Sequence, residues 1–455
     1  MNKIVKIAGL GSIISSMILS STVSFAKSKL LSPNDLIYVG AFRITHTKQE
    51  EGKTSWASNR FALNAKNNSF FFGGSPAFAV AEFRIPEIRD SDDFSALDFT
   101  GPPIQDFSDL SDRINYQTPN NNIRSIAGME LIDGKLFIST YDPYDAASSY
   151  GFDVDNMIVV DNASDLANSS VTGYFEIEGK MMASGWLSPI PQTLQVDLGG
   201  DYLSGSARWA SINTRWSQGP SAYSLFKSNL LSIENGETVP TTKLQRYDVN
   251  KRLDWRLENS NTWNYEGTNL IDTENCPGFA NDASLWKQEC VLENDIWTEV
   301  SRGAYGVIVP GTNTYLTLGV IGGRRHGIAY KNNPINRDGG NCPGECPYDW
   351  NDWDNYIWLF DVQDLIDHKN GLTEEYDAFP YYYGAIKLPF DDADGDGRIG
   401  EIVSADYDPS TNRLYIVLGQ GDLVQNKYEP NALILVYEIV LNRPNPPSDL
   451  SISTQ

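Results

Sequence analysis

The stretch "FALNAKNNSFFFGGSPAFAVAEFRIPEI" (residues 61–88) decides the fold class. It contains three short runs rich in Phe, Ala and Val, separated by Asn, Gly, Ser and Pro, which is typical of strands joined by turns. Consecutive strands with connections this short pair as neighbours in an antiparallel sheet. The segment therefore predicts a small antiparallel sheet.

The same order of elements recurs along the chain, and helical periodicity is nearly absent. Repeats of this size, each forming one sheet, predict an all-β protein with a β-propeller fold. At roughly 60 residues per blade, lengthened by long loop insertions, the propeller would have about seven blades, with six or eight left open. The further copies are "SADYDPSTNRLYIVLGQGD" with "ALILVYEIVL" (404–422, 432–441), 305–323 with 355–366, 126–143 with 156–166, and a weaker fifth copy at 207–231.

The two ends of the propeller are expected to meet. "LIYVGAFRI" (36–44) is a lone strand, which we expect to complete the sheet of 432–441 and so hide two free edges. We assign residues 27–441 to the propeller domain. Within it, the Trp- and Cys-rich stretch 252–300 is read as an insertion covering one face, or alternatively as an irregular blade. The Pro-rich tail 442–455 reads as a linker or the start of a further module.

Residues 1–26 have the layout of a signal peptide. Lys3 and Lys6 precede an apolar run, and Ser24, Phe25 and Ala26 supply a small-residue cleavage site. No later segment is long and apolar enough to span a bilayer. We therefore expect a secreted protein, extracellular or periplasmic, without membrane insertion.

The charge balance limits the partners. The chain has 59 acidic and 35 basic residues, a formal net charge of −24. This argues against nucleic acid, which binds Lys/Arg-rich surfaces. An anionic substrate stays open, because a local group of arginines can lie within an acidic surface. We expect a monomer.

The four cysteines are Cys276, Cys290, Cys342 and Cys346. In an exported chain an even number favours disulfides, most simply Cys276–Cys290 and Cys342–Cys346. A Zn²⁺ site that uses some of these thiolates, with His326, is the alternative.

"DDADGDGRIGEI" (391–402) predicts a structural Ca²⁺ site. Alternating aspartates and a glycine turn direct carboxylates toward one point, although the twelfth position of a calcium loop is Val403 and no helix flanks it. An empty acidic turn is the alternative. The expected ligands are Asp392, Asp394, Asp396, the backbone carbonyl of Arg398, and Glu401.

"IGGRRHG" (321–327) is the first candidate for catalysis. Arg324 and Arg325 could bind a carboxylate or sulfate through a planar guanidinium, and His326 could carry a proton. These are the groups that β-elimination from a uronic acid requires, a cation to neutralise the carboxylate and a base to remove the adjacent proton. Tyr330 follows as a further substrate contact. A solvated basic turn, a metal-bound histidine and a buried hydrogen-bond donor are the alternatives.

"ARWASINTRWSQGPSAY" (207–223) is the second candidate. Arg208 and Arg215 each precede a tryptophan, Trp209 in the first case, which suits a sugar with one apolar face and one acidic group. Tyr223 could return a proton to the leaving oxygen. Packing between blades is the alternative for the tryptophans. Arg124 and Arg302 stand before other strands and would be further anion contacts.

"YDWNDWDN" (348–355) supports a rival enzyme class. Asp349, Asp352 and Asp354 beside tryptophans are also typical of a glycoside hydrolase, with a second acid such as Glu130 or Asp142 from another blade. An acidic loop with buried indoles is the alternative.

Several phrases carry a family resemblance, among them "VGAFRI", "NTRWSQGPSAY", "VPGTNTYLTLG" and "DYDPSTNRLYIV". They look like phrases of large secreted bacterial propeller proteins. More loosely, the architecture and the Arg, His and Tyr inventory resemble the propeller ulvan lyases, which cleave a sulfated, uronic-acid-containing algal polysaccharide by β-elimination. Such lyases place a catalytic histidine in an early blade. The matching "SFFFGGSPAF" has none, so His326 or a tyrosine would fill that role.

These observations favour a secreted polysaccharide lyase. Arg325 or Arg215 would neutralise the uronate, His326 would act as base and Tyr223 as acid. The alternatives are a glycoside hydrolase with paired carboxylates and a non-catalytic propeller that binds glycan or protein.

Overall fold

The regular secondary structure of the computed structural model is mainly β-strand, with three short α-helices in the described residues. The helices are α1 (Gln195–Leu198), α2 (Lys227–Leu231) and α3 (Val362–Lys369). No helix in this part of the chain is long and apolar enough to cross a membrane. The structure describes residues 29–114, 125–141, 156–207, 216–256, 268–269, 294–331, 335–336, 342, 344–391, 399–426 and 428–441.

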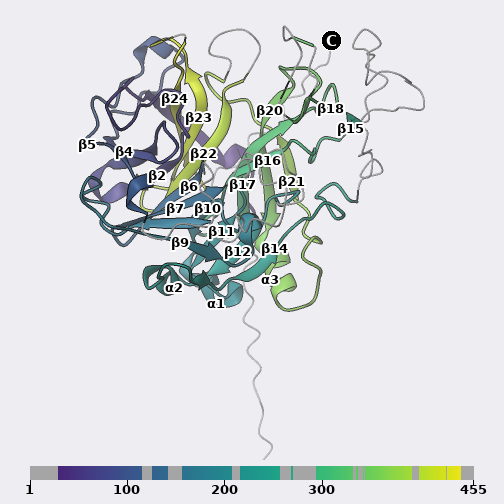
Figure 1. The fold of residues 1–455 in the computed structure, drawn as a ribbon. Helices are drawn as coiled ribbons and strands as arrows, with labels where there is room; N and C mark the ends of the chain where they lie inside the picture. Colours follow the sequence, from purple (N-terminus) through teal and green to yellow (C-terminus); the bar gives the residue numbers. More distant parts are fainter. Residues whose placement is uncertain are drawn as a thin grey trace, which may run out of the picture.

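Five of the six sheets in the described residues surround a central axis, with the colours of the sequence following one another round the ring (Figure 1). Each innermost strand contacts the innermost strands of the two neighbouring sheets, so the ring is closed. The innermost strands, in ring order, are β2 (Phe61–Asn64), β6 (Ser125–Ile132), β10 (Trp186–Pro189), β16 (Arg302–Ile308) and β22 (Glu401–Asp408).

Each inner strand belongs to a blade, which is an antiparallel sheet of four strands, and the blades are numbered 1 to 5 in the same ring order. Blade 2 also has a short fifth strand, β13 (Thr238–Val239), which pairs parallel with β9. The remaining strands are, in blade 1, β3 (Ser69–Gly73), β4 (Ala79–Arg84) and β5 (Gln105–Asp109); in blade 2, β7 (Lys135–Tyr141), β8 (Met157–Val160) and β9 (Val171–Ile177); in blade 3, β11 (Tyr202–Gly205), β12 (Ala222–Leu225) and β14 (Thr242–Gln245); in blade 4, β17 (Thr314–Gly322), β20 (Trp353–Asp361) and β21 (Tyr382–Ala385); in blade 5, β23 (Arg413–Asp422), β24 (Asn431–Ile439) and β1 (Leu36–Arg43).

The β-propeller prediction is confirmed, and the expectation of seven blades is wrong, because the described chain forms five. Division of the chain length by the length of one blade overestimated the number of blades, since much of the chain lies in connections between strands. Residues 246–301 join two blades, and residues 323–352 lie within one blade and carry most of a small extra sheet. That sheet consists of β15 (Thr268–Asn269), β18 (Ile328–Tyr330) and β19 (Glu345–Pro347).

Ring closure occurs as the sequence predicts. β1 pairs antiparallel with β24 from Leu36↔Ile439 to Arg43↔Leu433, so the start of the chain completes the last blade. Arg43 and Asp422 then form a buried two-point ion pair, with N–O distances of 2.9 and 3.1 Å. The Arg43 guanidinium lies 4.5 Å from the Phe94 ring centre and 4.4 Å from that of Phe99. A bidentate, mostly buried pair of this kind holds the two chain ends in one register.

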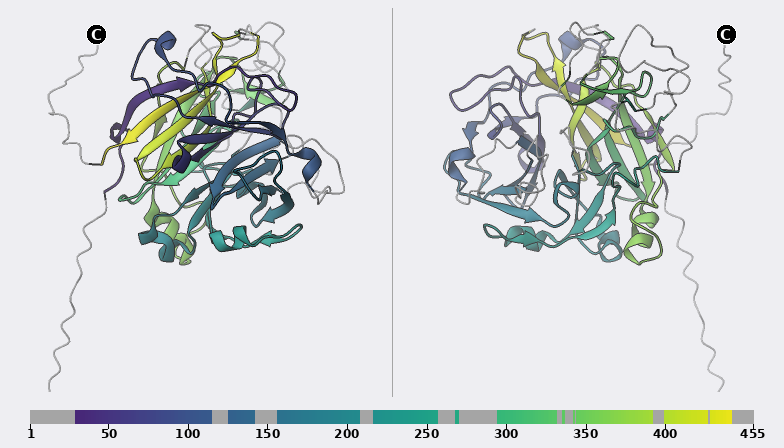
Figure 2. Two further views of the ribbon diagram at one scale, coloured as in Figure 1. Left: turned by 90° about the vertical axis from the view of Figure 1, so that its left-hand side faces the viewer. Right: turned by 45° about the vertical axis from the view of Figure 1, so that its right-hand side comes forward.

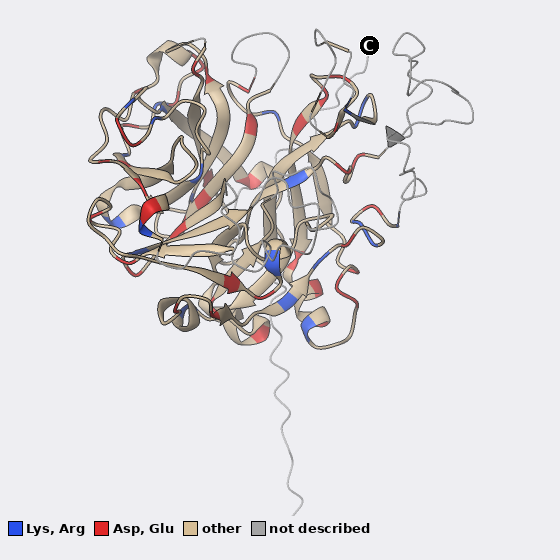
Figure 3. Cartoon of the chain, viewed as in Figure 1, with Lys and Arg blue, Asp and Glu red and all other residues tan. Residues whose placement is uncertain are grey.

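The core lies between the blades. Alternate residues of each strand point to opposite faces, and in the propeller both faces meet a neighbouring blade, so most residues of the inner strands are buried. Between blades 5 and 1, Phe61 stacks on Phe70 at 4.7 Å and approaches Tyr415 at 6.1 Å. Lys and Arg are interspersed with Asp and Glu around the ring, on turns and strand ends (Figure 3).

The helices lie together at one end of the molecule (Figures 1 and 2). α1 contacts α3, and α3 packs along β14, so they fill the space beside blades 3 and 4. The five inner strands begin at the opposite end, which we call the upper face.

Candidate functional site

A pocket of about 500 Å³ opens at the upper face of the propeller, between blades 5, 1 and 2. Its walls come from the residues just before or at the start of β2, β6 and β22, and from the end of β7. The side chains able to bind a ligand there are Trp56, Asn59, Arg60, Ser125, Tyr141, Glu401 and Gln420. The pocket therefore combines aromatic rings with polar groups at the hub of the ring.

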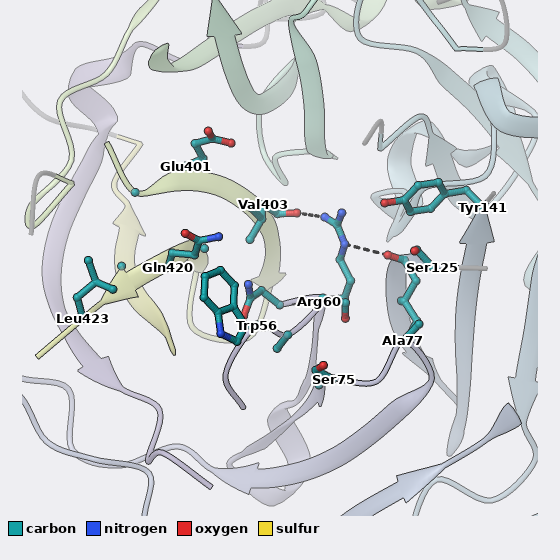
Figure 4. A pocket seen from close by; sticks show the side chains of 18 of the residues that line it. Trp56, Arg60, Ser75, Ala77, Ser125, Tyr141, Glu401, Val403, Gln420 and Leu423 are labelled. Carbon is teal, nitrogen blue, oxygen red and sulfur yellow. Dashed lines mark hydrogen bonds between the residues drawn. The ribbon is translucent and has the colours of Figure 1, made fainter. Parts of the chain in front are cut away.

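Arg60 is the central group of this pocket, and two β-bulges hold it (Figure 4). In β6 the register shifts between Ile126 and Gly128, and in β22 it shifts between Ile402 and Ser404. A bulge interrupts the ladder and leaves backbone groups available for other partners. The Arg60 Nε donates to the Ile126 carbonyl at 3.2 Å, and its Nη1 donates to the carbonyl of Val403, the extra residue of the second bulge.

Arg60 is a buried cation, only 4% exposed, and no carboxylate of the described residues forms an ion pair with it. Its partners are the two carbonyls and the Tyr141 phenol. Burial lowers the pKa of its guanidinium, while Tyr141 raises it. Buried charges in proteins are normally paired, so this arrangement favours binding of an anion from solution.

Tyr141 lies beside Arg60 at the end of β7. Its ring meets Trp216 edge-on, with ring centres 5.6 Å apart. Burial raises the pKa of the phenol, against the lowering effects of Arg60, a hydrogen bond with Ser125, and Arg302. The phenol is therefore protonated at neutral pH and surrounded by positive charge, which suits a proton donor to a developing oxyanion.

Glu401 forms the wall next to Arg302. The two side chains form an ion pair, and the Arg302 guanidinium also lies 4.9 Å from the centre of the Trp353 ring. Both side chains are largely buried. Arg302, which the sequence proposed as an anion contact, therefore orients a carboxylate at the pocket.

The backbone around the pocket is strained. Trp56, Asn59 and Gln420 have φ values of 53°, 56° and 58°, and all three line the pocket. Positive φ is tolerated by asparagine but is unfavourable for a bulky residue such as tryptophan. Strain of this kind concentrates at ligand sites, where the surrounding structure holds it.

Further along the hub lies a pair of buried carboxylates, Glu130 on β6 and Asp406 on β22. Asp406 accepts hydrogen bonds from the Leu63 N–H at 2.7 Å and the Tyr305 hydroxyl at 3.3 Å. Oε2 of Glu130 is buried and has no hydrogen-bond partner among the described residues. Burial raises the pKa of Asp406 to about 7, and burial with the Asp406 charge raises that of Glu130 well above its usual value.

The Arg-Arg-His turn lies elsewhere on the upper face, just after β17 in blade 4, at a strand end as the sequence predicts. Its cations pair with the acidic segment 349–354. Arg324 contacts Asp354 through Nε and Nη2 at 3.1 and 3.0 Å. Arg325 contacts Asp352 through Nε and Asp354 through Nη1, both at 3.0 Å.

His326 belongs to the same network. Its ring nitrogens lie 3.6 Å from Asp349 and 3.4 Å from Asp352, and its backbone N–H donates to Asp352 at 2.6 Å. The side chain of Asp352 is fully buried. The basic turn and "YDWNDWDN", which the sequence assigned to two rival enzymes, thus form one cluster in which the basic side chains contact aspartates.

Tyr223 is not brought to this turn. It lies in β12 of blade 3 and is buried among Phe137, Leu187 and Leu225, with Arg246 as a hydrogen-bond partner. Burial raises the pKa of its phenol. The side chain is part of the packing between blades 2 and 3, because its position in β12 points to that interface.

Other predicted site residues lie outside the described part of the chain. Tyr330 is in β18, and only its backbone is described. Among the expected calcium ligands only Glu401 is described, and it pairs with Arg302. The residues outside the description are Arg124, Asp142, Arg208, Trp209, Arg215, Asp392, Asp394, Asp396 and Arg398.

The predicted disulfide Cys342–Cys346 is confirmed, with an S–S distance of 1.99 Å. These two sulfur atoms are therefore not thiolate ligands for the zinc site considered as the alternative. Cys276 and Cys290 lie outside the described residues. No group of three or more His, Cys, Asp or Glu side chains is arranged to hold a metal ion in the part of the chain that the structure describes.

Sequence reasoning did not select Arg60 or Tyr141. Arg60 stands directly before the quoted repeat 61–88, and Tyr141 ends the strand of the copy 126–143. Their position in the repeat could have identified them, because a residue beside the start of an innermost strand lies near the hub. No cluster of unusual residues marks them.

No family model matches the chain, and no curated protein matches it. Two solved structures are similar in outline. A luciferin-regenerating enzyme has a TM-score of 0.32 and 9% identity, over 88% of this chain and 95% of its own. A Bacteroides fragilis protein described as exported has the same values over 91% and 98%. Neither is named as a polysaccharide lyase, and neither similarity is close enough to bear on what this chain binds.

Proposed function

We propose that the hub pocket binds a uronate unit of an anionic polysaccharide, and that the protein is an exported polysaccharide lyase. The observation that carries this proposal is Arg60, a buried guanidinium without a carboxylate partner among the described residues, facing a pocket with a phenol and an exposed indole. An arginine can bind a carboxylate through two parallel hydrogen bonds. A uronate supplies that charge, and the sugar rings of the polymer supply apolar faces for an aromatic side chain of the pocket.

The pocket residues fit β-elimination. Arg60 would neutralise the substrate carboxylate and so make the proton on the adjacent carbon more acidic. Glu401, oriented by Arg302, would take that proton. The electrons of this C–H bond would form a carbon–carbon double bond while the glycosidic C–O bond breaks, and Tyr141 would give its phenolic proton to the leaving oxygen. Exchange with solvent would then restore both groups.

An assay on several polysaccharides tests this function. The protein is incubated with ulvan, polygalacturonate, alginate and a neutral glucan, and the products are followed by ultraviolet absorbance and by reducing-end analysis. A lyase produces the conjugated double bond of an unsaturated uronate from an acidic polymer only. Reducing ends without that absorbance would reject elimination, and an absence of both binding and products would reject the proposal as a whole.

A glycoside hydrolase is the second candidate, because Glu130 and Asp406 form a buried pair of carboxylates with raised pKa values. One protonated and one ionised carboxyl is the requirement of that reaction. Two facts weigh against it, since neither side chain lines the pocket and Asp406 already accepts from Leu63 and Tyr305. Loss of hydrolysis in Glu130→Gln, with an unchanged melting temperature, would favour the hydrolase.

A further inference from the structure

Trp56 forms the outer wall of the hub pocket, and it is exposed although it is large and apolar. Its side chain lines the pocket, yet 56% of the residue's surface is accessible to solvent. Its backbone has the strained φ of 53°. An exposed indole held in an unfavourable backbone conformation is better explained by a binding role than by packing.

The surrounding chain holds this indole in place. The Trp56 backbone N–H donates to the Pro430 carbonyl at 3.4 Å, and its indole Nε1 donates to the Tyr428 carbonyl at 3.2 Å. The neighbouring residue Lys53 pairs with Ser75 through two backbone hydrogen bonds and contacts Glu429 at 3.3 Å. Both N–H donors of Trp56 are thus already used, and what remains for a ligand is the face of the ring.

Two further apolar side chains near Trp56 are also exposed. Tyr428 is 80% exposed and Val424 is 66% exposed, and Val424 follows the pocket residue Leu423. The hydrogen bond from Trp56 to Tyr428 places Tyr428 next to the indole. Exposed apolar residues therefore occur directly after the pocket residue Leu423 and at the residue whose carbonyl accepts from the indole.

We infer that Trp56 is a stacking platform for a second sugar ring, adjacent in the polysaccharide to the uronate bound at Arg60. This inference rests on the proposed function and deepens it, because it makes the hub a site for a segment of polymer and not for a single uronate. A sugar ring presents C–H groups that pack on an aromatic face, and the used indole N–H excludes recognition through a hydrogen bond from Trp56. The rigid hold on the ring reduces the entropy lost on binding.

Calorimetric titration with two probes tests the inference. Sodium glucuronate reaches the Arg60 site alone, whereas a β-1,4-linked tetraglucuronate also reaches Trp56. Both are titrated into Tyr141→Phe protein, so that the tetrasaccharide is not cleaved. We expect the tetrasaccharide to bind more tightly than the monosaccharide, and Trp56→Ala to weaken tetrasaccharide binding about tenfold while glucuronate binding is unchanged.

Three controls separate the outcomes. Trp56→Phe keeps an aromatic face and should retain most of the tetrasaccharide affinity, which a collapsed loop would not. Phe226→Ala removes an aromatic residue that is 51% exposed on blade 3, outside the pocket, and should change neither affinity. Unchanged tetrasaccharide binding in Trp56→Ala, or an equal loss for both probes, would overturn the platform. If the protein with Trp56 intact binds neither probe, that result would instead reject the proposed function.

Discussion

The upper face carries an arginine-rich turn whose cations are paired with aspartates. It also carries, at the hub, a single buried arginine that has no carboxylate partner among the described residues. In blade 4, Arg324, Arg325 and His326 stand together in the sequence, and each contacts an aspartate of the segment 349–354. At the hub, Arg60 stands alone in the sequence, is buried, and has carbonyls and a phenol as partners. The arginines of the conspicuous turn are thus neutralised by carboxylates, whereas the charge of Arg60 is not neutralised by any carboxylate of the described residues.

The difference shows that charge compensation decides which cation is available to a ligand. A guanidinium that already shares two carboxylates gains little from a third anion, which would also be repelled by them. A buried guanidinium surrounded by neutral dipoles gains much, because an incoming carboxylate supplies the missing counter-charge in a weakly screened site. Substitutions at the hub and at the basic turn should therefore have different consequences.

Replacement of Arg60 should have the largest effect on binding. In Arg60→Met, we expect the affinity for ulvan or glucuronate to fall about 30-fold or more, since removal of one partner of a buried charged pair costs about 2–5 kcal/mol. Arg60→Lys keeps the charge without the planar fork and should be intermediate. Calorimetric titration gives the affinities, and thermal melts show whether each variant folds. Equal binding by folded Arg60→Met would remove the hub from recognition.

Replacement of Asp352 should affect stability instead. Its buried carboxylate accepts from the backbone N–H groups of Arg325 and His326 and from the Arg325 guanidinium. In Asp352→Asn we expect the free energy of unfolding to fall by about 2–3 kcal/mol, because hydrogen bonds to a charged group are lost at a buried site. Urea unfolding measures this loss. Ulvan binding should be unchanged in the folded protein, and a parallel loss of affinity would assign the turn to the binding site.

The hub carboxylates predict a pH effect. In the folded protein the pKa of Asp406 is about 7, above its usual value near 3.8, so the folded state binds more protons than the unfolded state between these values. The free energy of unfolding should therefore fall as pH rises from about 4 through about 7, by about 2 kcal/mol or more. Urea titrations across this range measure the slope. Glu130→Gln removes one titrating group of the pair and should flatten the slope, and an unchanged slope would exclude the pair as its cause.

Replacement of Arg325 should have the smallest effect. Its side chain is 42% exposed, so solvent compensates much of the lost ion pairs, and Arg325→Ala should change the free energy of unfolding by less than about 1 kcal/mol. Cleavage of ulvan should continue in this variant and in His326→Ala. A loss of cleavage in either folded variant would restore the sequence-based hypothesis that this turn is catalytic.

Local patterns account for most of the fold prediction. Alternation of apolar residues and turn signals identified strands such as 69–73 and 431–439, because strand and turn preferences act over a few residues. The lone strand at the start of the chain was correctly paired with the last blade, since a sheet with exposed edges is unfavourable. Four copies identified their blades. The fifth, 207–231, contains one of the four strands of blade 3, because it begins after β11 and ends before β14.

The candidate site was less predictable. The sequence directed attention to the residues with the most distinctive chemistry, and the aspartates that neutralise them were read as the mark of another enzyme. Tyr223 was chosen by its chemistry but points to the packing between blades. Arg60 is unremarkable in sequence, and its importance follows from two bulges in strands far along the chain, whose carbonyls hold it at the hub.

The amino-acid sequence was sufficient to predict that this chain forms repeated antiparallel sheets and pairs its first strand with its last blade, because strand periodicity, turn chemistry and edge pairing are local or pairwise properties. The tertiary structure alone decided that the ring has five blades, that one arginine group is neutralised, and that Arg60, Tyr141 and Glu401 meet at one pocket. Those outcomes depend on which strand ends converge on the axis. They also depend on which charged side chains are then buried together and which of them are paired.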